Sequence, residues 1–153
     1  MQNDIGDLGE SIFKVVISRG YKFRPLHLGE KWPISDFYIE LIGTKKTMFF
    51  IVQIKATDQG FWGNGNLKVK LPKNKLHELN SYYCPTYLAG VDNASGRVFL
   101  TAINKNKRKG ISSLPPTFEL DLANQQILYD EIKRFWSNSN IEAYKRAFKH
   151  KVK

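Results

Sequence analysis

The sequence predicts an α/β domain in which a mixed central β-sheet is flanked by α-helices. Two observations predict this class. The first is a helical pattern at residues 5–19, followed by two strand-like runs at residues 35–42 and 47–56. The second is that strand-like and helical patterns continue to alternate through the rest of the chain. Apolar residues recur with a period near 3.6 in amphipathic helices and near 2 in strands, so the two can be told apart.

The N-terminal pattern predicts an amphipathic helix over residues 5–19, closed by Gly20. Its buried stripe is expected to comprise Leu8, Ile12, Val15 and Val16, widened by Phe13 and Ile17. Consecutive residues turn by about 100° around a helix, which places Glu10 at the edge of this stripe. We expect Glu10 to lean over the sheet that the helix covers. Taken alone, Glu10 also fits a solvated residue near a helix N-terminus.

The two strand-like runs are expected to form a β-hairpin, because residues 43–46 between them have the composition of a turn. Asp36 lies at the start of the first strand, and Gln53 and Lys55 share one face of the second. An acid that faces a polar residue and a lysine can hold a divalent metal beside a cation, which suits phosphodiester hydrolysis. The alternatives are a turn acid at Asp36 and an edge-strand lysine at Lys55.

The remaining elements follow from the same patterns. In chain order we expect a glycine-rich loop at residues 57–66, a strand at 66–71, a helix from Pro72 to about Tyr83 with Leu76 and Leu79 inward, strands at 86–92 and 97–103, a loop at 105–116, a short strand at 118–122, a helix at 124–136 and a short basic helix at 141–149. The inward residues of the helix at 124–136 are expected to be Ile127, Leu128, Ile132, Phe135 and Trp136.

The length and composition indicate one domain. The chain has 153 residues, of which 42% are hydrophobic and 13% aromatic. A chain of this size can bury a sizeable core, and this hydrophobic content argues against general disorder. We expect a single domain over residues 1–153, with its core at about 4–104 and a C-terminal helical portion at about 124–150.

Several classes of protein are disfavoured by the sequence. No stretch approaches the roughly 20 apolar residues of a membrane span, and the first residues have no signal-peptide pattern. A single cysteine, Cys84, precludes an intrachain disulfide and a zinc site with several cysteines. His27, His77 and His150 lack the spacing of a zinc hydrolase, and no nucleotide-binding phosphate loop occurs. We therefore expect a cytoplasmic protein without a membrane partner.

The charge of the chain favours a polyanionic partner. It has 24 basic and 14 acidic residues, for a formal net charge of +10. Nucleic acid is the expected partner, because lysine and arginine side chains contact backbone phosphates. The candidate binding residues are Lys68, Lys70, Lys73, Lys75, Lys105, Lys107, Arg108 and, as a base-stacking aromatic, Trp62. The alternatives are a solvated face for the lysines and burial in the core for the aromatic residue.

Several short motifs of this sequence resemble those of a known protein family. The segments that carry the resemblance are Gly9-Glu10, Ser35-Asp36-Phe37, Glu40 and Val52-Gln53-Ile54-Lys55-Ala56-Thr57. Their order and spacing resemble the PD-(D/E)XK nuclease superfamily, and most of all its bacterial DUF4365-type domain. Archaeal Holliday-junction resolvases and Mrr-type restriction nucleases are similar more distantly. The resemblance covers roughly residues 4–104.

The resemblance implies a restriction-endonuclease-like fold and a Mg²⁺- or Mn²⁺-dependent nuclease that hydrolyses DNA phosphodiester bonds, with RNA left open as a substrate. Asp36 would be the main metal ligand, assisted by Gln53 and the helix acid Glu10. Lys55 would be the catalytic lysine. Glu40 is a further candidate ligand, because it lies four residues after Asp36 on the same strand face. The implied setting is bacterial defence, restriction or repair, with a homodimer or a partner protein.

Two residues depart from the family pattern. Ser35 replaces the proline that precedes the aspartate, which is a common change in the superfamily. Gln53 stands where most members have a second acid, and it can offer a metal only a neutral carbonyl oxygen. This departure keeps open a different function, in which a catalytically inactive nuclease fold binds nucleic acid or a protein partner in a regulatory or immunity role.

Overall fold

A computed structural model of the chain describes residues 2–103 and 109–149. Three of the candidate nucleic-acid-binding residues, Lys105, Lys107 and Arg108, lie outside the described residues, so the prediction for them stays a prediction.

The centre of the fold is one five-stranded sheet whose strands lie side by side in chain order. Its strands are β1 (Phe23–His27), β2 (Phe37–Leu41), β3 (Phe49–Thr57), β4 (Thr86–Asp92) and β5 (Arg97–Ala102). The pair β3–β4 is parallel and the other three neighbouring pairs are antiparallel. Since parallel neighbours need a crossover, the chain passes through helix α2 (Lys73–Asn80) between β3 and β4. The prediction of an α/β class with a mixed sheet is confirmed.

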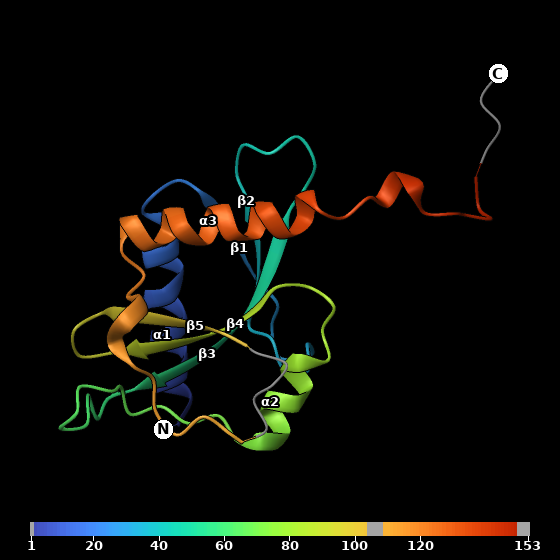
Figure 1. Ribbon diagram of the computed structural model, residues 1–153. Coiled ribbons are helices and arrows are strands. Elements are labelled where there is room, and N and C mark those ends of the chain that lie inside the picture. The colour runs from blue at the N-terminus through green and yellow to red at the C-terminus, as the bar shows by residue number, and fades with distance from the viewer. Residues whose placement is uncertain (1, 104–108, 150–153) are drawn as a thin grey trace.

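Two hydrophobic clusters lie on the two faces of the sheet. Helices α1 (Gln2–Ser18) and α3 (Leu122–Ser137) pack on one face, where the cluster includes Phe13, Phe50 and Ile132. Helix α2 packs on the other face, where Leu76 and Leu88 belong to the second cluster. Figure 1 shows α1 and α3 apart from α2 around the strands. None of the helices in the described part of the chain is long and apolar enough to cross a membrane.

Helix α1 is rotated relative to its predicted orientation. Phe13 and Ile17 are fully buried, whereas Leu8 and Val15, predicted to be inward, are 49% and 57% exposed. The reason is a close approach at Gly9, where an added Cβ would collide with the Cβ of Ala56 on β3. The helix therefore turns the line through Gly9, Phe13 and Ile17 toward the sheet, and this line runs directly beside Glu10.

Strand β1 lies in the segment between the predicted N-terminal helix and the strand at 35–42, for which the sequence analysis predicted no helix or strand. It pairs antiparallel with β2, and its Pro25 lies opposite Ile39. Proline lacks the amide N–H that a central strand needs, so a short run containing it is a weak strand signal and is found at sheet edges. The consequence for the site is that His27, the last residue of β1, lies opposite Phe37.

Two other predicted strands are not part of the sheet. Residues 66–71 keep the predicted alternation, since Leu67, Val69 and Leu71 are buried. They form only isolated bridges, to Phe61, Leu114 and Ile111. The segment 118–122 begins at the last residue of a 3₁₀ turn, Pro116–Phe118, and forms one bridge, between Glu119 and Phe99. Both segments pack against the sheet without extending it.

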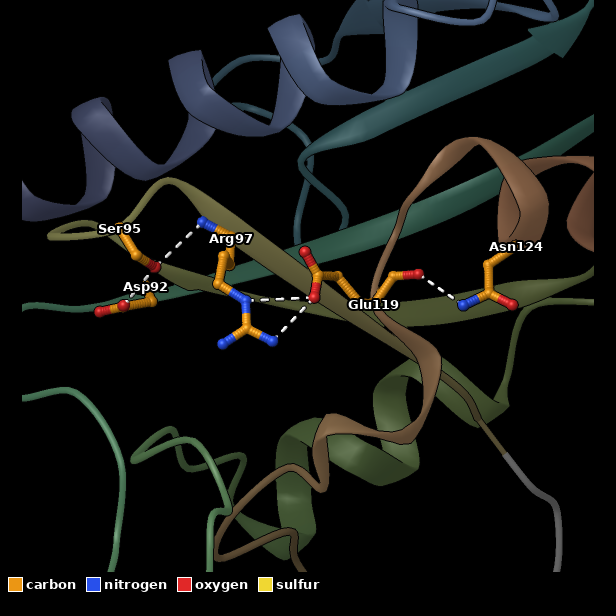
Figure 2. Close-up of polar contacts among 5 residues, drawn as sticks. All are labelled: Asp92, Ser95, Arg97, Glu119 and Asn124. Atoms are coloured by element: carbon orange, nitrogen blue, oxygen red, sulfur yellow. Dashed lines mark hydrogen bonds and ion pairs between the residues drawn. The ribbon is translucent and has the colours of Figure 1, made fainter.

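Glu119 attaches the start of α3 to strand β5, as Figure 2 shows. Its carboxylate Oε1 accepts hydrogen bonds from Arg97 Nε at 3.1 Å and Nη2 at 2.8 Å. Its backbone carbonyl accepts from Asn124 Nδ2 at 2.7 Å. The Asp121 side chain then caps the helix, because its Oδ1 accepts a hydrogen bond from the backbone N–H of Asn124 at 2.8 Å. In the same view, Ser95 bridges Asp92 and the Arg97 amide across the β4–β5 turn.

The C-terminal helices differ from the prediction in two ways. Leu128 and Ile132 of α3 are buried as predicted, but Ile127 and Phe135 are 58% and 43% exposed. Gln125 is buried in their place, and its Nε2 donates to the Val16 carbonyl at 3.0 Å. The predicted helix at 141–149 is reduced to a 3₁₀ turn at Ile141–Ala143. Beyond α3 the chain runs away from the rest of the molecule (Figure 1).

Candidate functional site

The site forms where strand β3 extends beyond its neighbour β2. The register between the two strands ends at the pair Phe37 and Val52, so the second half of β3 pairs with β4 alone. The Ile54 N–H is taken by Asp36, whose Oδ2 accepts it at 2.7 Å. The Asp36 amide in turn donates to the Val52 carbonyl at 3.0 Å. Two backbone-linked hydrogen bonds therefore fix Asp36 at the open side of β3.

Helix α1 brings Glu10 to the same place. The close contact of Gly9 with Ala56 holds the first turns of α1 against β3, and Asn93 Nδ2 donates to the Ile5 carbonyl at 3.0 Å. The Glu10 carboxylate pairs with His27, with Oε2 at 2.9 Å from Nε2. His27 also packs edge-on against the ring of Phe37. Glu10 thus bridges the N-terminal helix and the edge strand.

All four predicted catalytic residues line a single cavity of about 500 Å³. Glu10 comes from α1, Asp36 from the position immediately before β2, and Gln53 and Lys55 from β3. The wall is completed by residues that include Asp7, His27, Glu30, Trp32 and Lys75. The structure therefore brings together four predicted residues that lie up to 45 positions apart in the sequence.

Asp36 is the most perturbed carboxylate of this cavity. Burial raises its pKa from 3.8 to about 6, against the lowering effect of the hydrogen bond from the Ile54 N–H. The nearby Glu10 charge raises the pKa further, and His27 and Lys55 lower it. The charges of Glu10, His27 and Lys55 therefore all act on Asp36 inside the cavity, as expected of a site that handles charge.

Gln53 carries an unpaired oxygen beside Asp36. Its Nε2 donates to the Ile54 carbonyl at 3.3 Å, but its Oε1 is buried and has no hydrogen-bond partner among the described residues. Leaving a buried acceptor unpaired costs about 1–3 kcal/mol. A bound cation or hydrogen-bond donor in the cavity would relieve that cost, and an amide carbonyl is a known ligand for hard cations.

The donor set of the cavity fits only a loosely held cation. Within the described ranges, no group of three or more His, Cys, Asp or Glu side chains is arranged to hold a metal ion. The predicted ligands offer the carboxylates of Asp36 and Glu10 and the carbonyl of Gln53, and the acids Asp7 and Glu30 also line the cavity. Mg²⁺ is commonly bound through one or two carboxylates while it keeps several waters and contacts substrate phosphates. These residues fit an ion of that kind.

Glu40 lies outside this cavity, contrary to the expectation that it adds charge to the same site. Its carboxylate accepts hydrogen bonds from the Tyr38 hydroxyl at 2.7 Å and from Arg24 Nη1 at 3.3 Å. Four residues along a strand span about 13 Å, which is too far for one ion to bind both Asp36 and Glu40. Asp36 and Glu40 therefore do not belong to one site, although they were expected on the same strand face.

Three of the four described lysine candidates line one of two cavities. Lys75 lines the first one, with Asp36 and Lys55. Lys68, Lys70 and Trp62 line a second cavity of about 430 Å³, which also includes Ala56 and Thr57 of β3. Lys68 Nζ lies 4.6 Å from the centroid of the Trp62 ring, which is 50% exposed. Lys73 is exposed at the start of α2.

His27 and Trp32 are among the residues of the first cavity that the sequence analysis missed. His27 could have been found only by recognising Phe23–His27 as an edge strand despite Pro25. Trp32 is 48% exposed and lies in the irregular segment between β1 and β2, for which no periodic pattern exists. Aromatic residues in such connecting segments carry little sequence signal about the face that they line.

Comparisons with known proteins add no relative. No protein-family model matches the chain, and no curated protein matches it. The resemblance to the PD-(D/E)XK superfamily therefore depends on the motif residues alone.

Proposed function

We propose that this chain is a Mg²⁺- or Mn²⁺-dependent nuclease with a restriction-endonuclease-like fold, which hydrolyses phosphodiester bonds in DNA. The observation that carries the proposal is the convergence of Glu10, Asp36, Gln53 and Lys55 on one cavity from three separate elements. The resemblance of these residues to the PD-(D/E)XK superfamily supports the same function and favours a role in bacterial defence, restriction or repair.

Each residue has a role that its surroundings support. Asp36, the Gln53 carbonyl and Glu10 would hold the ion, which when bound polarises the phosphate and activates a water molecule. Lys55 lies near enough to lower the pKa of Asp36, so its ammonium group can orient the attacking water or offset negative charge on the phosphate. Lys75, on the wall of the cavity, can contact the substrate backbone.

The surface beside the cavity supports a nucleic-acid substrate. The second cavity continues along β3 from Lys55 through Ala56 and Thr57, and it presents Lys68, Lys70 and Trp62. Lysines there can bind phosphates, and a half-exposed indole can stack on a base. The net charge of +10 adds a general attraction for a polyanion.

The test is a cleavage assay on supercoiled, linear, single-stranded and branched DNA with Mg²⁺ or Mn²⁺. We expect the parent protein to cut at least one substrate and to stop when a chelator is added. Lys55→Ala should lose the activity, whereas Lys22→Ala, which alters another half-buried lysine outside the cavity, should keep it. Equal cutting by the two variants, or no cutting by the parent with either ion, would contradict the proposal.

A second candidate function is a catalytically inactive nuclease fold that binds nucleic acid or a protein partner. The observation that favours it is the pairing of Glu10 with His27 at 2.9 Å beside a neutral Gln53. Titration of Mn²⁺ into the parent and into Gln53→Glu separates the two. If the chain is an active nuclease, the parent protein should bind Mn²⁺. If it is an inactive fold, the parent should not bind the ion, and either the Gln53→Glu variant alone or neither protein should bind it.

A further inference from the structure

A continuous groove runs along helix α3, on the side of the molecule where β5 is the edge strand. It consists of two adjoining cavities of about 520 Å³ and 120 Å³, which share Tyr87, Ala102 and Glu131 as lining residues. It extends from Phe118 and Asn124 at one end to Ser139 at the other. The stretch of α3 beside it is about 20 Å long, which is the length of a short helix.

The groove exposes large apolar side chains. Ile127 and Phe135 of α3 are 58% and 43% exposed on its walls, and Phe118 at its end is 55% exposed. Ile127 and Phe135 belong to the apolar pattern that predicted a buried face on this helix. Nothing in the described part of the chain covers the three exposed side chains. Contiguous apolar patches of this kind are typical of interaction sites.

The C-terminal arm, residues 141–149, also exposes large apolar side chains that nothing covers in the described part of the chain. Ile141 and Tyr144 are 65% and 66% exposed and Phe148 is fully exposed, and their spacing places all three in one row on a helix. The Asn140 side chain already accepts hydrogen bonds from the Glu142 and Ala143 amides, as a helix N-cap does. A helix this short is not stable without a surface to pack against, so only its first turn is present.

We propose that the arm of one molecule binds, as an amphipathic helix, in the α3 groove of a second copy of this chain. A nine-residue helix is about 13 Å long and fits within the groove. The row of Ile141, Tyr144 and Phe148 matches the apolar walls. The arm also carries Lys145, Arg146 and Lys149, whereas the shared centre of the groove carries the acid Glu131.

A second copy fits better than the same molecule. Glu142 forms an ion pair with Lys46, and Trp136 Nε1 donates to the Phe49 carbonyl at 2.7 Å, which directs the chain past the β2–β3 turn. Figure 1 shows the arm leaving the molecule beyond the end of α3. To reach its own groove, the chain would have to reverse within three residues and break the Lys46 ion pair. Exchange between two copies keeps that contact and closes as a two-fold dimer.

The single cysteine of the chain allows a direct test. Cys84 is half-buried and lines the groove, and a disulfide forms only between residues whose Cα atoms come within about 7 Å. Lys145→Cys and Ala147→Cys place a thiol on either flank of the apolar row. Under mild oxidation we expect at least one variant to form a disulfide-linked dimer that Cys84→Ser abolishes. An intrachain disulfide, dimers that persist without Cys84, or no disulfide in either variant would overturn the proposal.

A second measurement removes the dependence on cysteine chemistry. Sedimentation of the full chain over a roughly hundredfold concentration range should show a monomer–dimer equilibrium. Ile127→Asp in the groove and Phe148→Asp in the arm should each weaken it at least tenfold, while Leu26→Asp should not. Leu26 is a matched control, because it is 59% exposed and lies on β1, outside the groove.

A monomer at every concentration, or equal weakening by the three variants, would overturn the proposal. If Phe148→Asp weakened only the retention of DNA on a gel, the arm would be a nucleic-acid contact and the proposal would also fail. The outcome does not depend on nuclease activity, so the dimer and the proposed function can fail separately.

Discussion

The two halves of strand β3 differ in their neighbours and in their chemistry. The first half pairs with β2, and from Ile51 onward also with β4. It holds Phe50, Ile51 and Val52, which are at most 5% exposed. The second half pairs with β4 alone and holds Gln53 and Lys55, which line the cavity. Because β3 extends beyond the end of β2, backbone N–H groups of its second half have no partner in β2. Asp36 accepts a hydrogen bond from one of them, that of Ile54, and so becomes part of a polar site.

The largest expected effect is the loss of stability in Phe50→Ala, compared with the loss of cleavage in Lys55→Ala on the other half of the strand. Phe50 is fully buried, and its ring centroid lies 5.5 Å from those of Phe23 and Tyr87. Phe50→Ala should therefore lower the free energy of unfolding by about 3–5 kcal/mol, because it removes apolar contacts and leaves a cavity. Lys55→Ala should lower it by less than about 1 kcal/mol while abolishing cleavage. Urea unfolding of both variants measures the contrast, and similar losses would remove the distinction between the two halves.

The next effect is a pH dependence that arises from Asp36. Its pKa is raised to about 6 in the folded chain, so the folded state binds a proton more readily than the unfolded state does. The stabilising contribution is complete below about pH 4 and is lost as the pH rises through about 6. The loss approaches about 3 kcal/mol for a pKa that moves from 3.8 to about 6.

Asp36→Asn should remove this slope. An asparagine carbonyl can still accept the Ile54 N–H, and it loses no proton between pH 4 and 7. We expect the variant to be more stable than the parent at pH 7 in the presence of a chelator, and to be inactive as a nuclease. Unfolding curves at several pH values measure the difference between the two proteins. Parallel pH profiles would show that Asp36 does not carry the effect.

The parts of the site that the sequence predicted are those fixed by local geometry. Asp36, Gln53 and Lys55 lie on neighbouring strands joined by a short turn, and the alternation of side chains along a strand determines which of them share a face. Such relations require no knowledge of distant contacts. The same reason explains why the β4–β5 pair and the inward Leu76 and Leu79 of α2 were predicted correctly.

The parts that were missed depend on contacts between distant segments. The rotation of α1 is decided by the approach of Gly9 to Ala56, 47 positions later in the chain. The pairing of Glu10 with His27 required a strand that Pro25 obscured in the sequence. On α3, periodicity showed that Ile127 belongs to an apolar face, but the pattern does not tell whether this chain or another covers that face.

The smallest expected effect is that of Glu40→Gln, which tests whether the site extends along β2 to Glu40. Glu40 has the residue type and strand face of a metal ligand, but its carboxylate is bound to Tyr38 and Arg24 about 13 Å along the strand from Asp36. Glu40→Gln should therefore change the rate of cleavage by less than about twofold. It should change the free energy of unfolding by at most about 1 kcal/mol, since the ion pair with the exposed Arg24 is a surface contact. Steady-state cleavage and urea unfolding measure the two quantities. A loss of activity comparable to that of Asp36→Asn would mean that the site reaches along β2, and that the end of pairing at Val52 does not set its boundary.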